Sequence, residues 1–208
     1  MAIGKTKADR PKPHHVKEAC LNEALAIVAR DGIEHLSLRE VARRLSISHQ
    51  TPYRHFKSRD HLLAALVARA YRDFASVLDK AADDPDAEKA LAQMGVAYLD
   101  YAAREPLAYR LMFGTPLPPA SEHPEMMGEA RHAFDLLLRA LERRSQAASS
   151  ERPRNRDAVY RDALFVWSAL HGFASIRSSS IFQTLDSDYG TMTAMVDNLL
   201  ADIGKGIA

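Results

Sequence analysis

The fold is decided by residues 37–62, SLREVARRLSISHQTPYRHFKSRDHL. Ser37 is followed three residues later by Glu40, which is the capping-box pattern with which many helices begin. A two-residue turn then interrupts the helical periodicity, and Ser48 is a suitable N-cap for a second short helix. The stretch therefore predicts two short helices joined by a tight turn, followed by a third helix that Ser58 caps.

Helical periodicity continues on both sides of this stretch, and no alternating β-strand pattern competes with it. Gly32 suits the left-handed position that follows a first helix. With the two short helices, the pattern predicts an all-α protein of about nine helices: an N-terminal three-helix, homeodomain-like helix-turn-helix and a C-terminal helical bundle. The other predicted helices cover 14–30, 58–82, 87–103, 106–113, 124–147, 157–182 and 191–204.

Composition places the chain among ordinary globular proteins, with 208 residues, 47% apolar and 26% charged. Its single cysteine, Cys20, excludes an internal disulfide framework and lies in an apolar-periodic segment, which predicts a buried thiol. The basic N-terminus lacks the apolar stretch of a signal peptide, and the apolar run 163–176 is too short to span a bilayer. We therefore expect a cytoplasmic protein that makes no membrane contact.

The net charge of +1 hides an asymmetry along the chain. Residues 1–60 contain 12 Lys and Arg against 7 Asp and Glu, a net +5, whereas residues 61–208 contain 16 against 20, a net −4. The basic end is the one that carries the short helix pair. This distribution suits attraction to phosphates at one end of the molecule only.

The second short helix carries a polar and aromatic run that suits DNA. A helix-turn-helix places its second helix in the major groove, where Gln50 can pair with adenine and Thr51 can contact thymine. Arg39 can reach a phosphate or a guanine edge, and the flanking basic and aromatic side chains suit phosphates, which position the protein without reading sequence. We predict binding to double-stranded operator DNA through Arg39, Ser48, His49, Gln50, Thr51, Tyr53, Arg54, His55, Lys57 and Arg59.

Residues 15–65 closely resemble the DNA-binding region of TetR-type transcriptional regulators. The resemblance rests on LREVA at 38–42 and on YRHFKSRD at 53–60. Two positions depart from the family pattern. Ser46 replaces the usual turn glycine, so the turn must avoid or tolerate a positive φ. Pro52 replaces the usual Leu, Val or Ile, which affects where the reading helix starts.

A second resemblance lies in the C-terminal part. Trp167, His171 and Gly172 form W-x-x-x-H-G, and together with PLAYRLMFG at 106–114 they resemble the WHG-type C-terminal domain of one TetR branch. Trp167 and His171 share a helix face. Gly172 costs about 1 kcal/mol relative to Ala in a helix, which predicts that another backbone packs close to it. The pair is either part of the core or part of a ligand cavity, and the two roles are compatible.

Aromatic and Met side chains recur at helical spacing in this part, either as core or as the adaptable wall of a cavity. They are Met94, Tyr98, Tyr101, Tyr109, Met112, Phe113, Met126, Met127 and Phe134. We predict that a small apolar or aromatic effector binds there, with no cofactor and no metal. The predicted ligand residues are Met94, Tyr98, Tyr101, Met112, Phe113, Phe134, Trp167 and His171.

The last two helices carry more apolar residues than one buried stripe needs. Between Leu164 and Ile176 these residues lie almost all round the helix, which predicts burial on all sides. The resemblance implies a homodimer through these two helices, a palindromic operator and a repressor role. The expected domains are a flexible basic arm (1–13), a helix-turn-helix DNA-binding domain (14–60) and a ligand-binding and dimerisation domain (61–208).

Other classes of protein fit the sequence less well. There is no Gly-rich phosphate loop, no H-E-x-x-H and no G-x-S-x-G, so we do not expect an enzyme. A metal sensor is an alternative, but His14, His15, His123 and His132 lack ligand spacing. A regulator controlled by a protein partner is another alternative, which a closed, fully packed C-terminal core would favour.

Overall fold

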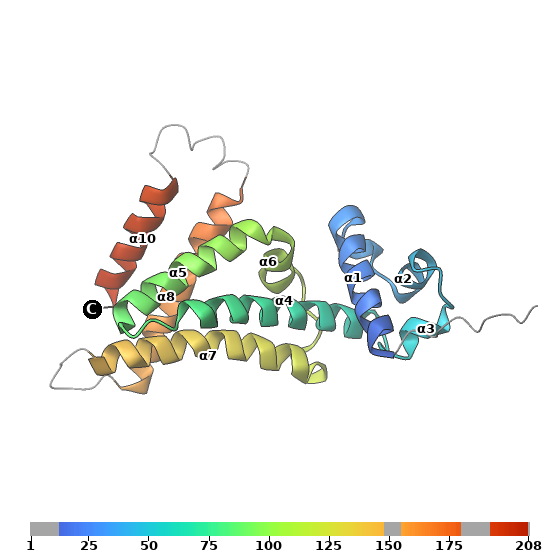
Figure 1. Cartoon of the computed structure of the whole chain (residues 1–208), viewed down its shortest axis with the longest axis horizontal. Coiled ribbons are helices and arrows are strands. Elements are labelled where there is room, and N and C mark those ends of the chain that lie inside the picture. Colours follow the sequence, from blue (N-terminus) through green and yellow to red (C-terminus); the bar gives the residue numbers. More distant parts are fainter. Residues whose placement is uncertain (1–12, 148–154, 180–191, 208) are drawn as a thin grey trace, which may run out of the picture. The chain divides into compact units, whose positions relative to one another are not determined.

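The computed structural model describes residues 13–147, 155–179 and 192–207, and this part of the chain is all-helical (Figure 1). It contains nine α-helices and two short 3-10 helices, which confirms the predicted fold class. The predicted basic arm, apart from Pro13, lies outside the described residues. The elements are α1 Pro13–Asp31, η1 Ile33–His35, α2 Leu38–Arg44, α3 Gln50–Tyr53, α4 Arg59–Ala81, α5 Ala87–Arg104, α6 Pro106–Phe113, η2 Ala120–Glu122, α7 Pro124–Ala147, α8 Arg156–Arg177 and α10 Met192–Gly206.

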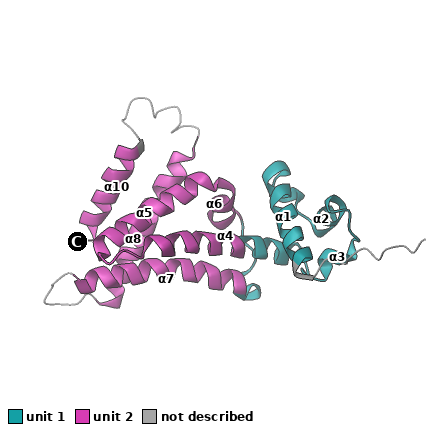
Figure 2. Ribbon diagram, viewed as in Figure 1, with its two compact units in different colours: residues 1–67, 116–124 teal, residues 68–115, 125–208 magenta. Residues whose placement is uncertain are grey.

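The chain divides into two compact units (Figure 2). Unit 1 comprises residues 1–67 and 116–124, and unit 2 comprises residues 68–115 and 125–208. Helix α4 therefore contributes its first turns to unit 1 and its remainder to unit 2. The segment 116–124, which contains η2, joins unit 1 although it is distant in sequence.

Unit 1 packs α1, α2 and α3 around a small apolar core. Ile27, Val41 and Leu62 are fully buried there, and Phe56 is nearly so. Cys20 is also fully buried, which confirms the sequence prediction, and burial raises the pKa of its thiol. Side chains from α1, α2, the loop after α3 and the start of α4 thus form the core of this unit.

The turn between α2 and α3 is held by a residue in the left-handed conformation. Ser46 has φ +52°, and among the described residues it is the one non-glycine with a positive φ. Its N–H donates to the Arg43 carbonyl at 3.2 Å, and the Ile47 N–H donates to the Ala42 carbonyl at 3.0 Å. This is a Schellman motif with serine at the position that glycine usually holds. The family departure at Ser46 is therefore tolerated as strain, not avoided.

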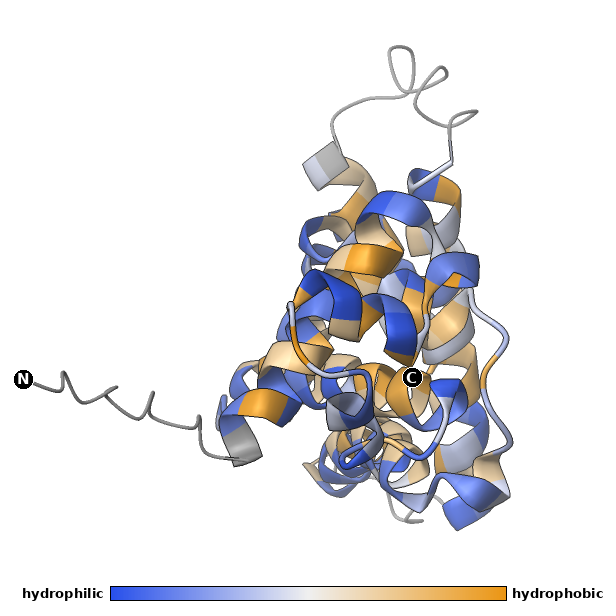
Figure 3. Cartoon of the chain, turned by 90° about the vertical axis from the view of Figure 1, so that its right-hand side faces the viewer, coloured by the Kyte–Doolittle hydropathy of each residue, from blue (hydrophilic) through white to orange (hydrophobic). Residues whose placement is uncertain are grey.

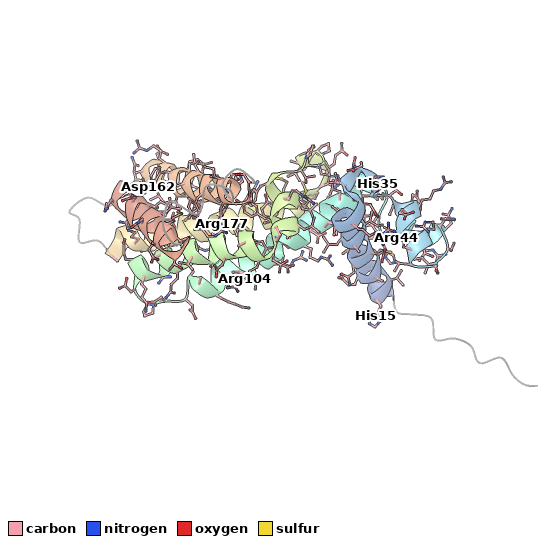
Figure 4. All side chains as sticks on the ribbon, turned by 90° about the horizontal axis from the view of Figure 1, so that it is seen from above. His15, His35, Arg44, Arg104, Asp162 and Arg177 are labelled. Carbon is pink, nitrogen blue, oxygen red and sulfur yellow. The ribbon has the colours of Figure 1, made fainter. Side chains whose placement is uncertain are left out.

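Unit 2 is built around α5, which packs against α6, α8 and α10. The Asp86 carboxylate caps α5 by accepting from the Glu88 and Lys89 N–H groups at 2.9 and 3.1 Å. Hydrophobic and hydrophilic residues both occur along the helices of the chain, as amphipathic packing requires (Figure 3). Arg177, labelled in Figure 4, donates to the Leu99 carbonyl and so joins the end of α8 to α5.

Helix α8 ends earlier than the sequence predicted. The helix was expected to reach residue 182, but it ends at Arg177. The Ser178 and Ser179 hydroxyls donate to the carbonyls of Ser175 and Ile176 at 2.8 and 2.7 Å. Such side-chain bonds compete with helical backbone bonds, and consecutive serines therefore favour termination. Residues 180–182 lie outside the described part.

Candidate DNA interface and ligand cavity

The predicted reading helix is short, since α3 comprises only Gln50–Tyr53. The Ser48 hydroxyl accepts from the Gln50 N–H at 3.4 Å, and the Ser48 carbonyl accepts from the Thr51 N–H at 2.9 Å. Pro52 is buried within α3, where its missing N–H does no harm because the first N–H groups of a helix have no acceptor inside it. After α3 the chain turns tightly, and the Pro52 carbonyl accepts from the N–H groups of His55 and Phe56, both at 2.9 Å.

The predicted DNA-binding residues lie mainly on the surface of unit 1. All are exposed except Thr51 and His55, which are half-buried, and the Tyr53 side chain is 48% exposed. No side-chain hydrogen bond or ion pair to another described residue forms at Arg39, Gln50, Tyr53, Arg54 or Lys57. These side chains therefore keep their donors and acceptors available for an external partner.

Arg59 differs from the other predicted DNA-binding residues. Its Nε donates to the Leu36 carbonyl at 3.0 Å, and its Nη2 donates to the Ile33 carbonyl at 2.7 Å. Two of its donor groups are thus used to join the start of α4 to the segment that precedes α2. The sequence gives no sign of this role, because an arginine that binds carbonyls of its own chain cannot be told from one that binds a phosphate.

The predicted capping box of α2 forms only in part. The Ser37 hydroxyl accepts from the Glu40 N–H at 3.1 Å, as predicted. The Glu40 carboxylate instead accepts from Arg43 at 2.6 and 2.8 Å and from Arg44 at 2.7 Å. These hydrogen bonds, first to Arg43 and then to Arg44, lower the pKa of Glu40 to about 2.

Arg44 joins α1 to α2 inside unit 1 and is labelled in Figure 4. Besides Glu40 it pairs with Asp31 and, at 3.7 Å, with Glu23. Its side chain is only 12% exposed, so the cluster is partly sheltered from solvent. Arg44 therefore belongs to the scaffold that supports the reading helix.

Unit 2 encloses a small apolar cavity of about 30 Å³ between α4, α5, α7 and α8. Three of the predicted ligand residues, Met94, Tyr98 and Trp167, line it. Its other walls are mainly aliphatic and were not selected from the sequence, because such residues at helical spacing look like any core. They are Phe74, Leu78, Leu91, Gly95, Ala133, Leu137, Val166 and Leu170.

The other predicted ligand residues pack around this cavity without lining it. The Tyr101 hydroxyl donates to the Ala70 carbonyl at 3.2 Å, and Met112 is buried. The rings of Phe113 and Phe134 lie 5.9 and 5.0 Å from that of Trp167, centroid to centroid. Phe113 and Phe134 thus pack beside Trp167, and the Tyr101 ring packs against Phe74.

His171 takes part in a buried hydrogen-bond network instead. The Tyr109 hydroxyl lies 2.7 Å from His171 Nδ1 and 3.0 Å from the Tyr98 hydroxyl. Burial raises the pKa of both Tyr98 and Tyr109, so both phenols stay neutral. Tyr109 was noted in the sequence but not selected as a site residue. The network satisfies the polar atoms beside the cavity and leaves an apolar interior.

The expectation for Gly172 was wrong. A Cβ built on this residue meets nothing within 4 Å, so no backbone of the described chain packs there. Gly172 lies on the outward face of α8, together with Leu164 (47% exposed), Phe165 (47%) and Ile176 (58%). Phe165 lies against Gly206 of α10, whereas the part of this face around Leu164, Gly172 and Ile176 remains exposed within the described chain.

No group of three or more His, Cys, Asp or Glu side chains among the described residues could hold a metal ion. No described helix is long and apolar enough to cross a membrane.

Comparison with known families decides the identity of the helix-turn-helix and the bundle. Residues 21–66 match the model of bacterial regulatory proteins of the tetR family, and residues 91–201, more than half of the chain, match the tetracyclin repressor-like C-terminal domain. The chain belongs to the TetR family. It is therefore a DNA-binding transcriptional regulator with a helix-turn-helix, and not an enzyme.

Individual relatives and solved structures match nearly the whole chain. An uncharacterised HTH-type transcriptional regulator from Mycobacterium tuberculosis is 28% identical over 189 residues, which is 91% of this chain and 82% of the relative. A protein of unknown function from Rhodococcus sp. RHA1 has the same fold, with TM-score 0.73, 23% identity and coverage of 98% and 97%. A tetR-family regulatory protein from Rhodococcus RHA1 gives TM-score 0.67, 18% identity and coverage of 93% and 97%.

Proposed function

We propose that this TetR-family regulator is a repressor that binds a palindromic operator as a homodimer and is released by a small apolar or aromatic molecule. The observation that carries the proposal is the set of exposed side chains on and beside α3 that have no partner in the described chain. Side chains of this kind, next to a helix start in a basic unit, suit a major groove and its phosphates.

The proposed roles divide between reading and positioning. Gln50 and Thr51 contact base edges, and Arg39 contacts a guanine edge or a phosphate. Contacts to phosphates come from the remaining predicted residues, namely Ser48, His49, Tyr53, Arg54, His55, Lys57 and Arg59. Arg59 has the smallest share, because two of its donor groups already bind carbonyls of unit 1.

The proposed dimer forms through α8 and α10. The uncovered apolar face around Leu164, Gly172 and Ile176 supports this, since such a face costs free energy in water unless a partner covers it. A two-fold axis through this interface relates two reading helices, so the operator is palindromic.

The proposed release begins in unit 2. The apolar lining of the cavity supports an apolar effector, and α4 belongs in part to each unit. Binding that displaces α4 changes the spacing of the two reading helices, so that the dimer no longer engages both half-sites at once. A second candidate, control by a protein partner, is favoured by the small size of this cavity, about 30 Å³.

The test of DNA binding is gel retardation of promoter DNA at several salt concentrations. Replacing Tyr53 and Lys57 with Ala should weaken binding to all sequences and reduce its salt dependence, whereas Gln50→Ala should change the sequence preference. Lys80→Ala, which removes an exposed cation from unit 2, is the control. Binding without preference over competitor DNA contradicts the proposal, and an unchanged preference in the Gln50 variant contradicts that base contact. Release of bound operator by apolar molecules separates the effector from the protein-partner candidate.

A further inference from the structure

A groove of about 750 Å³ lies on unit 2 between α5, α8 and α10, the three helices labelled in Figure 1. Its floor is apolar and includes Leu91, Val96, Val166, Leu170, Leu200 and Ile203. Pockets that take small molecules measure roughly 300–1,000 Å³ and are mainly apolar. The groove has this size, whereas the inner cavity, at about 30 Å³, has room for little more than a water molecule.

The groove and the inner cavity share a wall. Leu91, Gly95, Val166 and Leu170 line both of them. The two spaces are therefore separated by one layer of side chains, and by bare backbone at Gly95. A molecule that lies in the groove needs only a small local rearrangement to extend into the cavity.

Leu200 covers this wall at its thinnest point. A Cβ built on Gly95 would lie 2.5 Å from Leu200 Cδ2, so the leucine side chain rests in the space that the missing side chain leaves. Leu200 comes from α10 and is itself half-buried. A rotamer change of this one side chain uncovers Gly95, because a leucine on a helix surface has alternative staggered conformations.

The cations that line the groove are already paired, and Asp197 adds a carboxylate to the lining. Among the lining residues, the cations are Lys89, Arg144 and Lys205. Arg144 pairs with Glu88 at 2.5 Å, Lys89 with Asp84 at 2.8 Å and Lys205 with Asp202 at 2.9 Å. Inside, the Tyr98 hydroxyl is bound to Tyr109. An anionic ligand would have to break one of these pairs or bury an unpaired charge, which is unfavourable.

We infer that the effector binds in this groove as a neutral, elongated, apolar molecule whose narrow end passes Leu200 and enters the inner cavity. The inference rests on the proposed control by an effector and names its site and chemical class. It makes Leu200 and Gly95 determinants of specificity: the leucine side chain sets the width of the opening, and the glycine sets its depth.

The charge of the ligand is tested with two fluorescent probes on the full chain. N-phenyl-1-naphthylamine is neutral, and 8-anilino-1-naphthalenesulfonate has the same ring system with an added sulfonate. We expect the neutral probe to bind at one site per chain and at least about tenfold more tightly than the anionic probe, because each cation among the described lining residues already has an acidic partner. Equal affinity, or tighter binding of the anion, overturns the assignment of a neutral ligand.

The location is tested with Leu200→Trp and a matched control, Leu199→Trp, at a neighbouring half-buried leucine of α10 that does not line the groove. Leu200→Trp should weaken binding of the neutral probe about tenfold or more by filling the groove floor, and Leu199→Trp should not. Leu200→Ala should speed association of the probe. All variants are first checked for helical content and for retention of promoter DNA.

The outcomes separate this inference from the proposed function. If the probe binds all variants alike while apolar molecules still release the operator, the groove is not the site and the proposed function stands. If Leu200→Trp changes the oligomeric state instead of probe affinity, a second copy of the chain occupies the groove and the inference is overturned. If no apolar probe binds and none releases the operator, both the inference and the proposed effector control fail.

Discussion

Ser46 shows how a single residue sets the turn ahead of the reading helix. At φ +52° its backbone is in the left-handed conformation, which costs non-glycine residues about 1–2 kcal/mol, whereas glycine adopts it freely. Replacing it with glycine should therefore raise the free energy of unfolding by about 0.5–1 kcal/mol, after allowance for the greater freedom of glycine in the unfolded chain. Urea denaturation measures the change. Ser46→Ala is the control, because it keeps the Cβ, and an equal gain from alanine would contradict the strain.

Glu40 gives the stability of unit 1 a defined acid dependence. Its pKa falls from 4.5 to about 2 in the folded state. A lowered pKa in the folded state stabilises the protein above the unfolded pKa, and this stabilisation is lost as the pH falls toward the folded value. Glu40→Gln should therefore be less stable than the parent at pH 6, and the difference should shrink steadily between pH 4.5 and 2.

The measurement is a series of denaturant titrations across that pH range. Glu142→Gln, an exposed acid on α7, is the control and should leave the pH dependence of the parent unchanged. A Glu40 variant whose deficit is the same at pH 3 as at pH 6 would show that Glu40 does not titrate with the lowered pKa.

At the scale of elements, the outward face of α8 carries a diagnostic glycine. A Cβ added to Gly172 would have no neighbouring atom of the described chain within 4 Å. On a free surface, Gly172→Ala should stabilise the helix by about 1 kcal/mol. At a close-packed interface between two copies, the same methyl group should weaken association instead.

We therefore expect Gly172→Ala to weaken the dimer, measured by analytical ultracentrifugation over a range of concentrations. Thermal unfolding at a concentration where the parent is monomeric should show the opposite sign, a small gain in stability. An unchanged dimer affinity would place Gly172 outside the interface.

Helices were predictable from the sequence where caps and apolar periodicity agreed, as at Ser37 and Ser58. They were less predictable at helix ends, where local side-chain hydrogen bonds compete with those of the backbone. The serines after Arg177 end α8 early, and α3 has only four residues.

The candidate sites were predictable to different degrees. The exposure of the proposed DNA-binding side chains follows from polarity and helical spacing alone. The walls of the cavity cannot be predicted in this way. An aliphatic residue at core spacing, such as Leu91 or Val166, has the same sequence pattern whether or not it lines a cavity. The lack of a close backbone at Gly172 also depends on tertiary packing, which one sequence does not show.

At the scale of the whole molecule, operator binding should depend on assembly. Leu164 is 47% exposed on the outward face of α8, and a glutamate there would place a charge in the proposed interface. Leu164→Glu should yield monomers by light scattering and reduce affinity for a two-half-site operator about a hundredfold or more, because each half-site is then bound alone. Leu117→Glu, at a leucine 40% exposed in unit 1, is the matched control. A dimeric Leu164 variant would move the interface elsewhere.

The buried thiol also makes the protein easy to label. Cys20 is the only cysteine of the chain, is fully buried and has a raised pKa, so it is closed to maleimides in the folded state. A cysteine introduced at Arg54 would be the one accessible thiol of each copy. Spin labels attached there report, by pulsed electron paramagnetic resonance, the separation of two reading helices. Because the parent protein has no accessible thiol, it does not have to be made cysteine-free first. The effect of an effector can then be measured as a change in the single distance between the two spin labels.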